Sequence, residues 1–157
     1  MITIETFEPD KQVPYRVIEY RGHDDKMICR LWLDTDNRIA RIYLHDRRSD
    51  RQPDCVVLFG ADHANVLGIQ EFIYDNLNRL SERIEYEVCD GKKIQIQKLK
   101  YYYDGESGRN NKTVLYGRTE EPVGYMLSTY DDAGIAPMGM YNMNHEPVDR
   151  FNLERLF

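Results

Sequence analysis

The sequence contains few cysteines. Among 157 residues there are three, Cys29, Cys55 and Cys89, and none of them lies in a CxxC spacing. An odd number without paired spacing argues against a disulfide framework. Cys29 and Cys55 are flanked by apolar residues, so we interpret them as reduced thiols within strands, where cysteine behaves as a small hydrophobic residue.

Long apolar runs are also missing. No window approaches the roughly 18 consecutive apolar residues that a membrane-spanning helix needs. The stretch from Met1 to Glu5 has no basic region followed by an apolar run, so it does not predict a signal peptide. We therefore expect a cytoplasmic protein that does not contact a membrane.

The sequence lacks the motifs that usually carry catalysis, nucleotide binding or metal binding. There is no GxGxxG, GxxxxGK[ST] or GxSxG pattern. The histidines form no HxH or HExxH spacing, which excludes the familiar zinc pairs; they are His23, His45, His63 and His145. We therefore predict no catalytic residue, no metal and no cofactor, and favour binding over enzymatic activity.

Basic residues are fewer than acidic residues. The chain has 21 Lys and Arg against 27 Asp and Glu, which gives a net charge of −6. This balance disfavours direct binding of nucleic acid, because that requires basic side chains against phosphates. It favours association with a basic protein partner, since opposite fields speed encounter. A mildly acidic balance is also common in proteins that only need to stay in solution.

One segment has the spacing of an amphipathic helix. Between Asp62 and Leu80 the apolar residues recur at helical intervals, with Asp62 in the position of an N-cap. Glu71 and Asp75 fall on the opposite side, which predicts an acidic face in water. The residues of the apolar stripe are Val66, Ile69, Ile73, Leu77 and Leu80.

The remaining sequence alternates between apolar and polar residues, as strands do. Three strands joined by turns are predicted between residues 14 and 45, a buried strand at 55–59, and a hairpin around Asp90-Gly91. We expect an α+β fold: an antiparallel sheet of about six to eight strands with the helix packed on one face. Residues 1–157 would form one domain, with 131–157 as an irregular tail and Asp149 capping a short final helix.

Tyrosine is the residue type that bears most directly on function. The chain has 12 tyrosines, and Tyr101, Tyr102 and Tyr103 are consecutive. On a strand, one face of this triplet must be exposed or meet a partner. Tyrosine is favoured at interfaces because it combines a large apolar area with one polar group. The alternative is an edge tyrosine that packs on the stem of Lys98 or Lys100.

These observations lead to a first hypothesis. The chain would be a small acidic binding protein that neutralises a macromolecular partner by occlusion. Examples are an immunity protein against a toxin, or a phage or plasmid inhibitor of a bacterial defence nuclease. The partner would be a basic protein, and the predicted contact residues are Glu71, Asp75, Glu82, Tyr101, Tyr102 and Tyr103.

Two other functions are compatible with the same sequence. The first is a small-molecule-binding protein or an enzyme with an anionic ligand, using His23, His63 or His145 and the loop with Arg47 and Arg48. The second is a homo-oligomeric structural module, for example a homodimer in which the tyrosine strand pairs with its symmetry mate.

Overall fold

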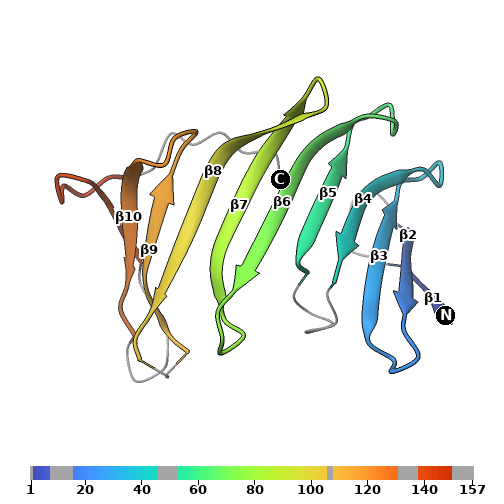
Figure 1. The fold of residues 1–157 in the computed structure, drawn as a ribbon, viewed down its shortest axis with the longest axis horizontal. Helices are drawn as coiled ribbons and strands as arrows, with labels where there is room; N and C mark the ends of the chain where they lie inside the picture. Colours follow the sequence, from blue (N-terminus) through green and yellow to red (C-terminus); the bar gives the residue numbers. More distant parts are fainter. Residues whose placement is uncertain (1, 8–15, 46–52, 106–107, 131–137, 150–157) are drawn as a thin grey trace. The chain divides into compact units, whose positions relative to one another are not determined.

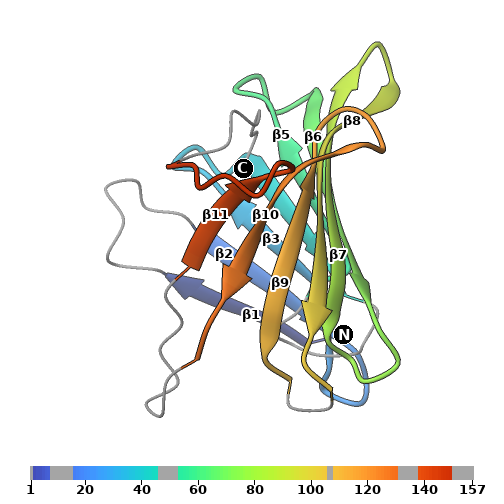
Figure 2. The same ribbon diagram turned by 90° about the vertical axis from the view of Figure 1, so that its left-hand side faces the viewer.

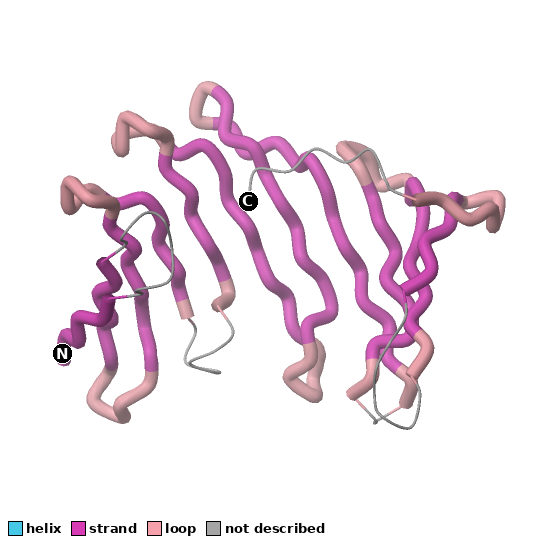
Figure 3. The backbone as a smooth tube through the Cα atoms, turned by 180° about the vertical axis from the view of Figure 1, so that it is seen from behind, coloured by secondary structure: helices cyan, strands magenta, loops and turns pink. Residues whose placement is uncertain are grey.

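The described part of the chain is entirely β-structure. A computed structural model describes residues 2–7, 16–45, 53–105, 108–130 and 138–149, and every regular element in these ranges is a strand (Figure 3). Successive strands are hydrogen-bonded neighbours in the order of the sequence, and the pairs are antiparallel (Figure 1). The strands are β1 (Ile2–Phe7), β2 (Arg16–Arg21), β3 (Met27–Leu33), β4 (Ile39–Leu44), β5 (Cys55–Phe59), β6 (Val66–Tyr74), β7 (Leu80–Cys89), β8 (Lys92–Tyr103), β9 (Asn110–Tyr116), β10 (Pro122–Ser128) and β11 (Met138–Asn142).

The predicted α+β fold with its major helix is wrong. The segment from Asp62 to Leu80 contains the end of one turn, the nine-residue strand β6, a second turn at 75–79 and the start of β7. Asp62 is not an N-cap, because the turn in which its carboxylate accepts the backbone N–H groups of Ala64 and Asn65 leads into strand β6 and not into a helix. The number of strands also exceeds the predicted six to eight.

The composition of β6 explains this outcome. Its β-branched and aromatic residues favour an extended backbone, and an interior glycine disfavours a helix. Alternation along the strand places Gly68 and Gln70 in buried positions, whereas Leu67 and Ile73 are exposed. The apolar stripe expected for a helix is therefore divided between the two faces of a strand.

Four hairpin turns share one backbone pattern. In each, the first residue donates its N–H to the carbonyl of the fifth residue, and the fourth donates to the carbonyl of the first. The fourth residue has a positive φ of 59–64°, a region that Asn, Asp and His tolerate better than most residues. The turns span 22–26, 34–38, 75–79 and 142–146.

An acidic or amide side chain closes three of these turns. The Oδ1 atoms of Asp34, Asp75 and Asn142 each accept the backbone N–H groups of the third and fifth residues of the turn, at 2.8–3.0 Å. Asp and Asn favour turns because they can replace a backbone acceptor in this way. These five-residue turns reverse the chain within a few residues, so the strands that they connect pair directly and need no helix between them. The predicted hairpin at Asp90-Gly91 is confirmed, with φ of 51° and 71°.

The same hydrogen bonds lower the pKa of three turn aspartates below its ordinary value of 3.8. The largest cause is the backbone N–H of Arg38 for Asp34, of Asn65 for Asp62, and of Arg79 for Asp75. A carboxyl group whose pKa is lower in the folded than in the unfolded state stabilises the fold above the unfolded pKa. That contribution is lost as the pH falls through the folded pKa.

We therefore expect the free energy of unfolding in urea to decrease as the pH is lowered from about 5 toward 2. The substitution Asp75→Asn should make this decrease smaller. An amide oxygen can still accept the two backbone N–H groups, as Asn142 does, but it does not titrate in this range. An unchanged pH dependence in Asp75→Asn would show that this turn does not contribute to acid sensitivity.

The chain forms two compact units. Unit 1 comprises residues 1–71 and 87–93, and unit 2 comprises 72–86 and 94–156. The buried apolar residues of unit 1 include Val17, Met27, Leu33 and Val56. In unit 1, Glu19 lies between two arginines and its carboxylate contacts Arg21 at 3.1 Å and Arg30 at 2.6 Å, which ties β2 to β3.

Unit 2 has two sheet faces that follow from the register of β8, β9 and β10 (Figure 2). On one face Tyr101 lies opposite Thr113, which lies opposite Met126. On the other face Tyr102 lies opposite Lys112, which lies opposite Leu127. The buried apolar residues of this unit are Ile84, Ile96, Leu99, Val114, Leu115 and Tyr125. The predicted irregular tail contains β11, and the helix predicted after Asp149 lies outside the described residues.

Candidate ligand-binding site

The three acidic residues predicted to contact a partner do not form a helix face. Glu71 lies in β6 and pairs with Lys93 at 2.6 Å, and Glu82 lies in β7 and pairs with Lys100 at 3.5 Å. Asp75 closes a hairpin turn and also accepts a hydrogen bond from Arg79 Nε at 2.8 Å. The helix face predicted for these residues is therefore wrong, because they lie on two strands and in a turn.

The tyrosine triplet does lie on a strand. Because side chains alternate along β8, Tyr101 and Tyr103 share one face and Tyr102 lies on the other. Tyr102 is 42% exposed. The hydroxyl of Tyr103 donates to the backbone carbonyl of Leu80 at 2.7 Å, so it holds the end of β8 against the start of β7.

Tyr101 and Tyr103 line a groove in unit 2, which we call the tyrosine groove. Its volume is about 640 Å³. It lies over the face that carries Thr113 and Met126, so strands β7 to β10 all contribute to it. The residues that line it are Leu80, Arg83, Leu99, Tyr101, Tyr103, Gly108, Asn110, Thr113, Met126, Ser128 and Tyr130.

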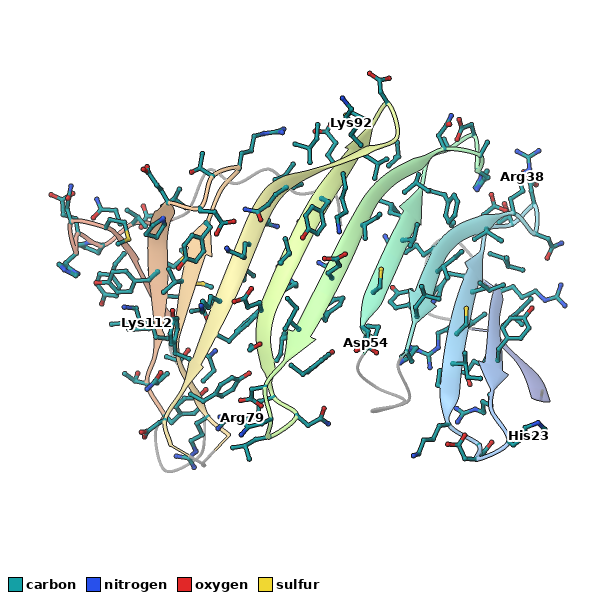
Figure 4. All side chains as sticks on the ribbon, in the orientation of Figure 1. His23, Arg38, Asp54, Arg79, Lys92 and Lys112 are labelled. Atoms are coloured by element: carbon teal, nitrogen blue, oxygen red, sulfur yellow. The ribbon has the colours of Figure 1, made fainter. Side chains whose placement is uncertain are left out.

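Two of the aromatic walls are fixed in place. The Tyr130 hydroxyl donates to the backbone carbonyl of Asn110 at 2.8 Å, as Tyr103 does to Leu80. Guanidinium groups also stack on both rings, with Arg79 at 4.6 Å from the Tyr103 centroid and Arg109 at 5.4 Å from that of Tyr130. Arg79 projects from the turn between β6 and β7 (Figure 4). Such contacts limit the rotation of the tyrosines, which prepares a binding surface before a ligand arrives.

Arg83 is the single charged residue among the described residues that line the groove. Its Nη2 lies 3.6 Å from Glu85 Oε1, within ion-pair range but beyond hydrogen-bond distance. Glu85 is only 3% exposed, and its carboxylate accepts a hydrogen bond from the amide of Gln97, which is 1% exposed. The guanidinium therefore stands beside a buried acid that is already hydrogen-bonded.

Several hydrogen-bond donors at the groove have no acceptor among the residues that the structure describes. The buried Nε of Arg83 and the buried Nδ2 of Asn110 are two of them. Tyr101 also lines the groove, and its hydroxyl is a further donor. Burial raises the pKa of Tyr101 above 10.0, so the hydroxyl keeps its proton at neutral pH. Arg83 Nε and Asn110 Nδ2 are enclosed by the protein, so a ligand in the groove reaches Arg83 through the rest of its side chain, which is 28% exposed.

The histidines of the second hypothesis do not line this groove. His23 occupies an exposed turn of unit 1 (Figure 4). His63 lies with Nε2 at 2.8 Å from Asp34 and Nδ1 at 3.0 Å from the carbonyl of Ile39. His145 Nδ1 is 2.7 Å from the hydroxyl of Tyr125. Arg47 and Arg48 lie outside the described residues.

Two of the three cysteines, Cys29 and Cys55, lie within strands, as predicted from their apolar neighbours. Cys29 and Cys55 are half-buried in β3 and β5, and burial raises the pKa of both thiols, which lowers their reactivity. Cys89 is exposed at the end of β7. Among the described residues no cluster of His, Cys, Asp and Glu could hold a metal ion. The same ranges contain no helix long and apolar enough to cross a membrane.

Comparison with known proteins gives no further guide. No protein family matches the chain, and no curated protein matches its sequence.

Two of the residues that line the groove had been predicted from the sequence, but as contacts of a protein partner and not of a small ligand. Tyr101 and Tyr103 were predicted contacts, whereas Arg83, Asn110 and Tyr130 were not singled out. One signal was present in the sequence: Arg83 and Glu85 have the same parity, which places them on one face of β7. Nothing in the local sequence of Asn110 or Tyr130 indicates that they approach Tyr101.

Proposed function

We propose that this chain is a binding protein that holds a small organic molecule in the tyrosine groove of unit 2. The observation that carries this proposal is the groove itself, whose largely aromatic and aliphatic lining contains one cation, Arg83, with a side chain that is 28% exposed. Ligand sites typically combine a mostly apolar lining with a few convergent polar groups. A volume of about 640 Å³ is within the usual range of about 300–1,000 Å³ for such sites. We also propose that the protein acts in the cytoplasm, as its sequence favours.

Titration with N-phenylnaphthylamine tests this proposal, because this neutral dye becomes fluorescent in apolar sites. We expect saturable binding at one site, and a loss of about fivefold to tenfold in affinity in Tyr101→Ala, the equivalent of roughly 1–1.4 kcal/mol. Met126→Trp should also weaken binding, because a larger side chain fills the groove.

Tyr102→Ala is the matched control, since it removes the same type of side chain from the next position of β8 on the other face. Its affinity for the dye should stay within about twofold of the native value, and circular dichroism should show that all three variants are folded. Absence of saturable binding, or equal effects of Tyr101→Ala and Tyr102→Ala, would contradict the proposal.

Occlusion of a basic protein partner is a second proposal, and one observation favours it. On the face opposite the groove, Tyr102 and Leu127 are exposed and flank Lys112, which projects from β9 (Figure 4). Exposed apolar side chains on one face of a sheet are typical of interaction surfaces, and a basic partner would have to keep its own cations away from Lys112. Tyr101→Ala and Tyr102→Ala distinguish the two proposals. Occlusion would be supported if the native protein captured a partner that Tyr102→Ala no longer bound, while Tyr102→Ala still bound the dye.

A further inference from the structure

We infer that the ligand of the tyrosine groove carries a carboxylate and that Arg83 recognises it. This inference rests on the proposed binding function and adds the chemical class of the ligand. It concerns a non-covalent contact, so no bond in the ligand is formed or broken.

Charge is the first argument. Arg83 is the single charged group in the described lining, and the groove has no carboxylate of its own among those residues. The nearby acid, Glu85, is buried and already accepts a hydrogen bond from Gln97. A lining with one cation and no anion among the described residues favours an anionic ligand, because opposite charges attract more strongly at a partly buried site than in bulk water.

Geometry is the second argument. The guanidinium is a planar group with five donors, and its fork matches the two oxygens of a carboxylate. Its ion pair with Glu85 spans 3.6 Å, beyond hydrogen-bond distance, and its side chain is 28% exposed, so Glu85 does not occupy all the donors of Arg83. Tyr101 lines the same groove, and its hydroxyl can also donate. These groups all donate, which suits a ligand group that only accepts.

The charge of Glu85 limits the charge of the ligand. A doubly charged phosphate would add two negative charges beside this buried acid, whereas a carboxylate adds one. The apolar walls formed by Leu80, Leu99 and Met126 require that the rest of the ligand be aromatic or aliphatic. We therefore assign the site to an apolar molecule with one carboxylate.

In this arrangement Glu85 and Gln97 act as positioning residues. Gln97 holds the carboxylate of Glu85 within the sheet, and Glu85 in turn orients the guanidinium from one side. Removing the charge of Glu85 while keeping its shape should strengthen the attraction between Arg83 and an anion. A purely structural role for Glu85 would not produce this gain.

Displacement of N-phenylnaphthylamine by naphthylacetate and by naphthylacetamide tests the inference. The two probes differ only in the charged group, so their ratio of affinities measures recognition of the carboxylate. We expect the native protein to prefer the acid by about tenfold or more, since hydrogen bonds to charged groups are the stronger ones.

Three variants locate this preference. R83Q/E85Q removes both charges and avoids a buried acid without its counter-ion. It should bind acid and amide within about threefold of each other. E85Q alone keeps an acceptor for Gln97 and should bind the acid more tightly than the native protein. Lys112→Gln removes a cation from the other face and should leave the preference unchanged.

Equal affinity of the native protein for acid and amide would overturn the inference, as would a preference that persists in R83Q/E85Q. Both results differ from failure of the proposed function, in which the dye itself does not bind at the groove. If Lys112→Gln abolished the preference while R83Q/E85Q did not, the anion would bind on the opposite face, and the assignment to Arg83 would be wrong.

Discussion

Replacing Gln97 with leucine is expected to lower the free energy of unfolding by about 2–3 kcal/mol, because it removes a hydrogen bond from a buried charged group. Gln97 is 1% exposed and Glu85 is 3% exposed, and the amide of one donates to the carboxylate of the other. Water cannot replace the lost donor at that depth. Leucine has a similar volume, so the loss reports the hydrogen bond and not a cavity. Urea unfolding at neutral pH, followed by circular dichroism, measures the change.

The double variant E85L/Q97L is the control for this prediction. It removes both polar groups together, and replacing a buried polar pair with apolar residues of similar size is often nearly neutral. It also removes the ion pair between Glu85 and Arg83, which is why full recovery is not expected. We expect it to recover at least about half of the stability lost in Gln97→Leu, which would appear as a coupling energy in a double-mutant cycle. Additive losses would show that the two side chains stabilise the sheet independently.

The wrong helix prediction has a definite physical source. Val66, Ile69 and Ile73 are spaced as on a helix, but the same residues are β-branched and fit a strand equally well by propensity. The signals that decide between the two are in the flanking turns. Asp75 with Asn78 three residues later repeats the pattern of Asp34 with Asn37, and both pairs form the same hairpin turn. The turn at Asp34 therefore predicts a second turn at Asp75, which is incompatible with a helix that continues to Leu80 and agrees with the end of β6 at Tyr74.

The candidate site could be predicted only in part, because its residues come from different strands. Alternation along β8 is a local property, and it separates Tyr101 and Tyr103 from Tyr102 without knowledge of the fold. The position of Thr113 opposite Tyr101 depends on the register of β9. That register is set by the turn after β8 and by a shift between Tyr102 and Tyr103, which the sequence does not reveal. Arg83 and Asn110 could not be brought to the tyrosines for the same reason.

Leu99 in β8 and Leu115 in β9 form an apolar row beside the groove, and a substitution in this row is the second one expected to change stability strongly. Leu115 is 2% exposed and lies opposite Leu99 in the register of β8 and β9. Leu115→Ala is expected to lower the free energy of unfolding by about 2–5 kcal/mol, since it removes buried methyl groups and leaves a cavity. Leu127→Ala is the matched control, because Leu127 is 37% exposed and its loss should cost less than about 1 kcal/mol.

The same pair of variants relates stability to binding. Leu99 lines the tyrosine groove and packs in the row that Leu115 completes, so a cavity at Leu115 lets this part of the lining relax. We expect Leu115→Ala, at a temperature where it remains folded, to bind N-phenylnaphthylamine more weakly than Leu127→Ala does. Equal dye affinity in the two variants would mean that the groove depends on the fixed tyrosine rings alone. Tyr103 and Tyr130, each held by a backbone carbonyl and a guanidinium, would then be sufficient to keep its shape.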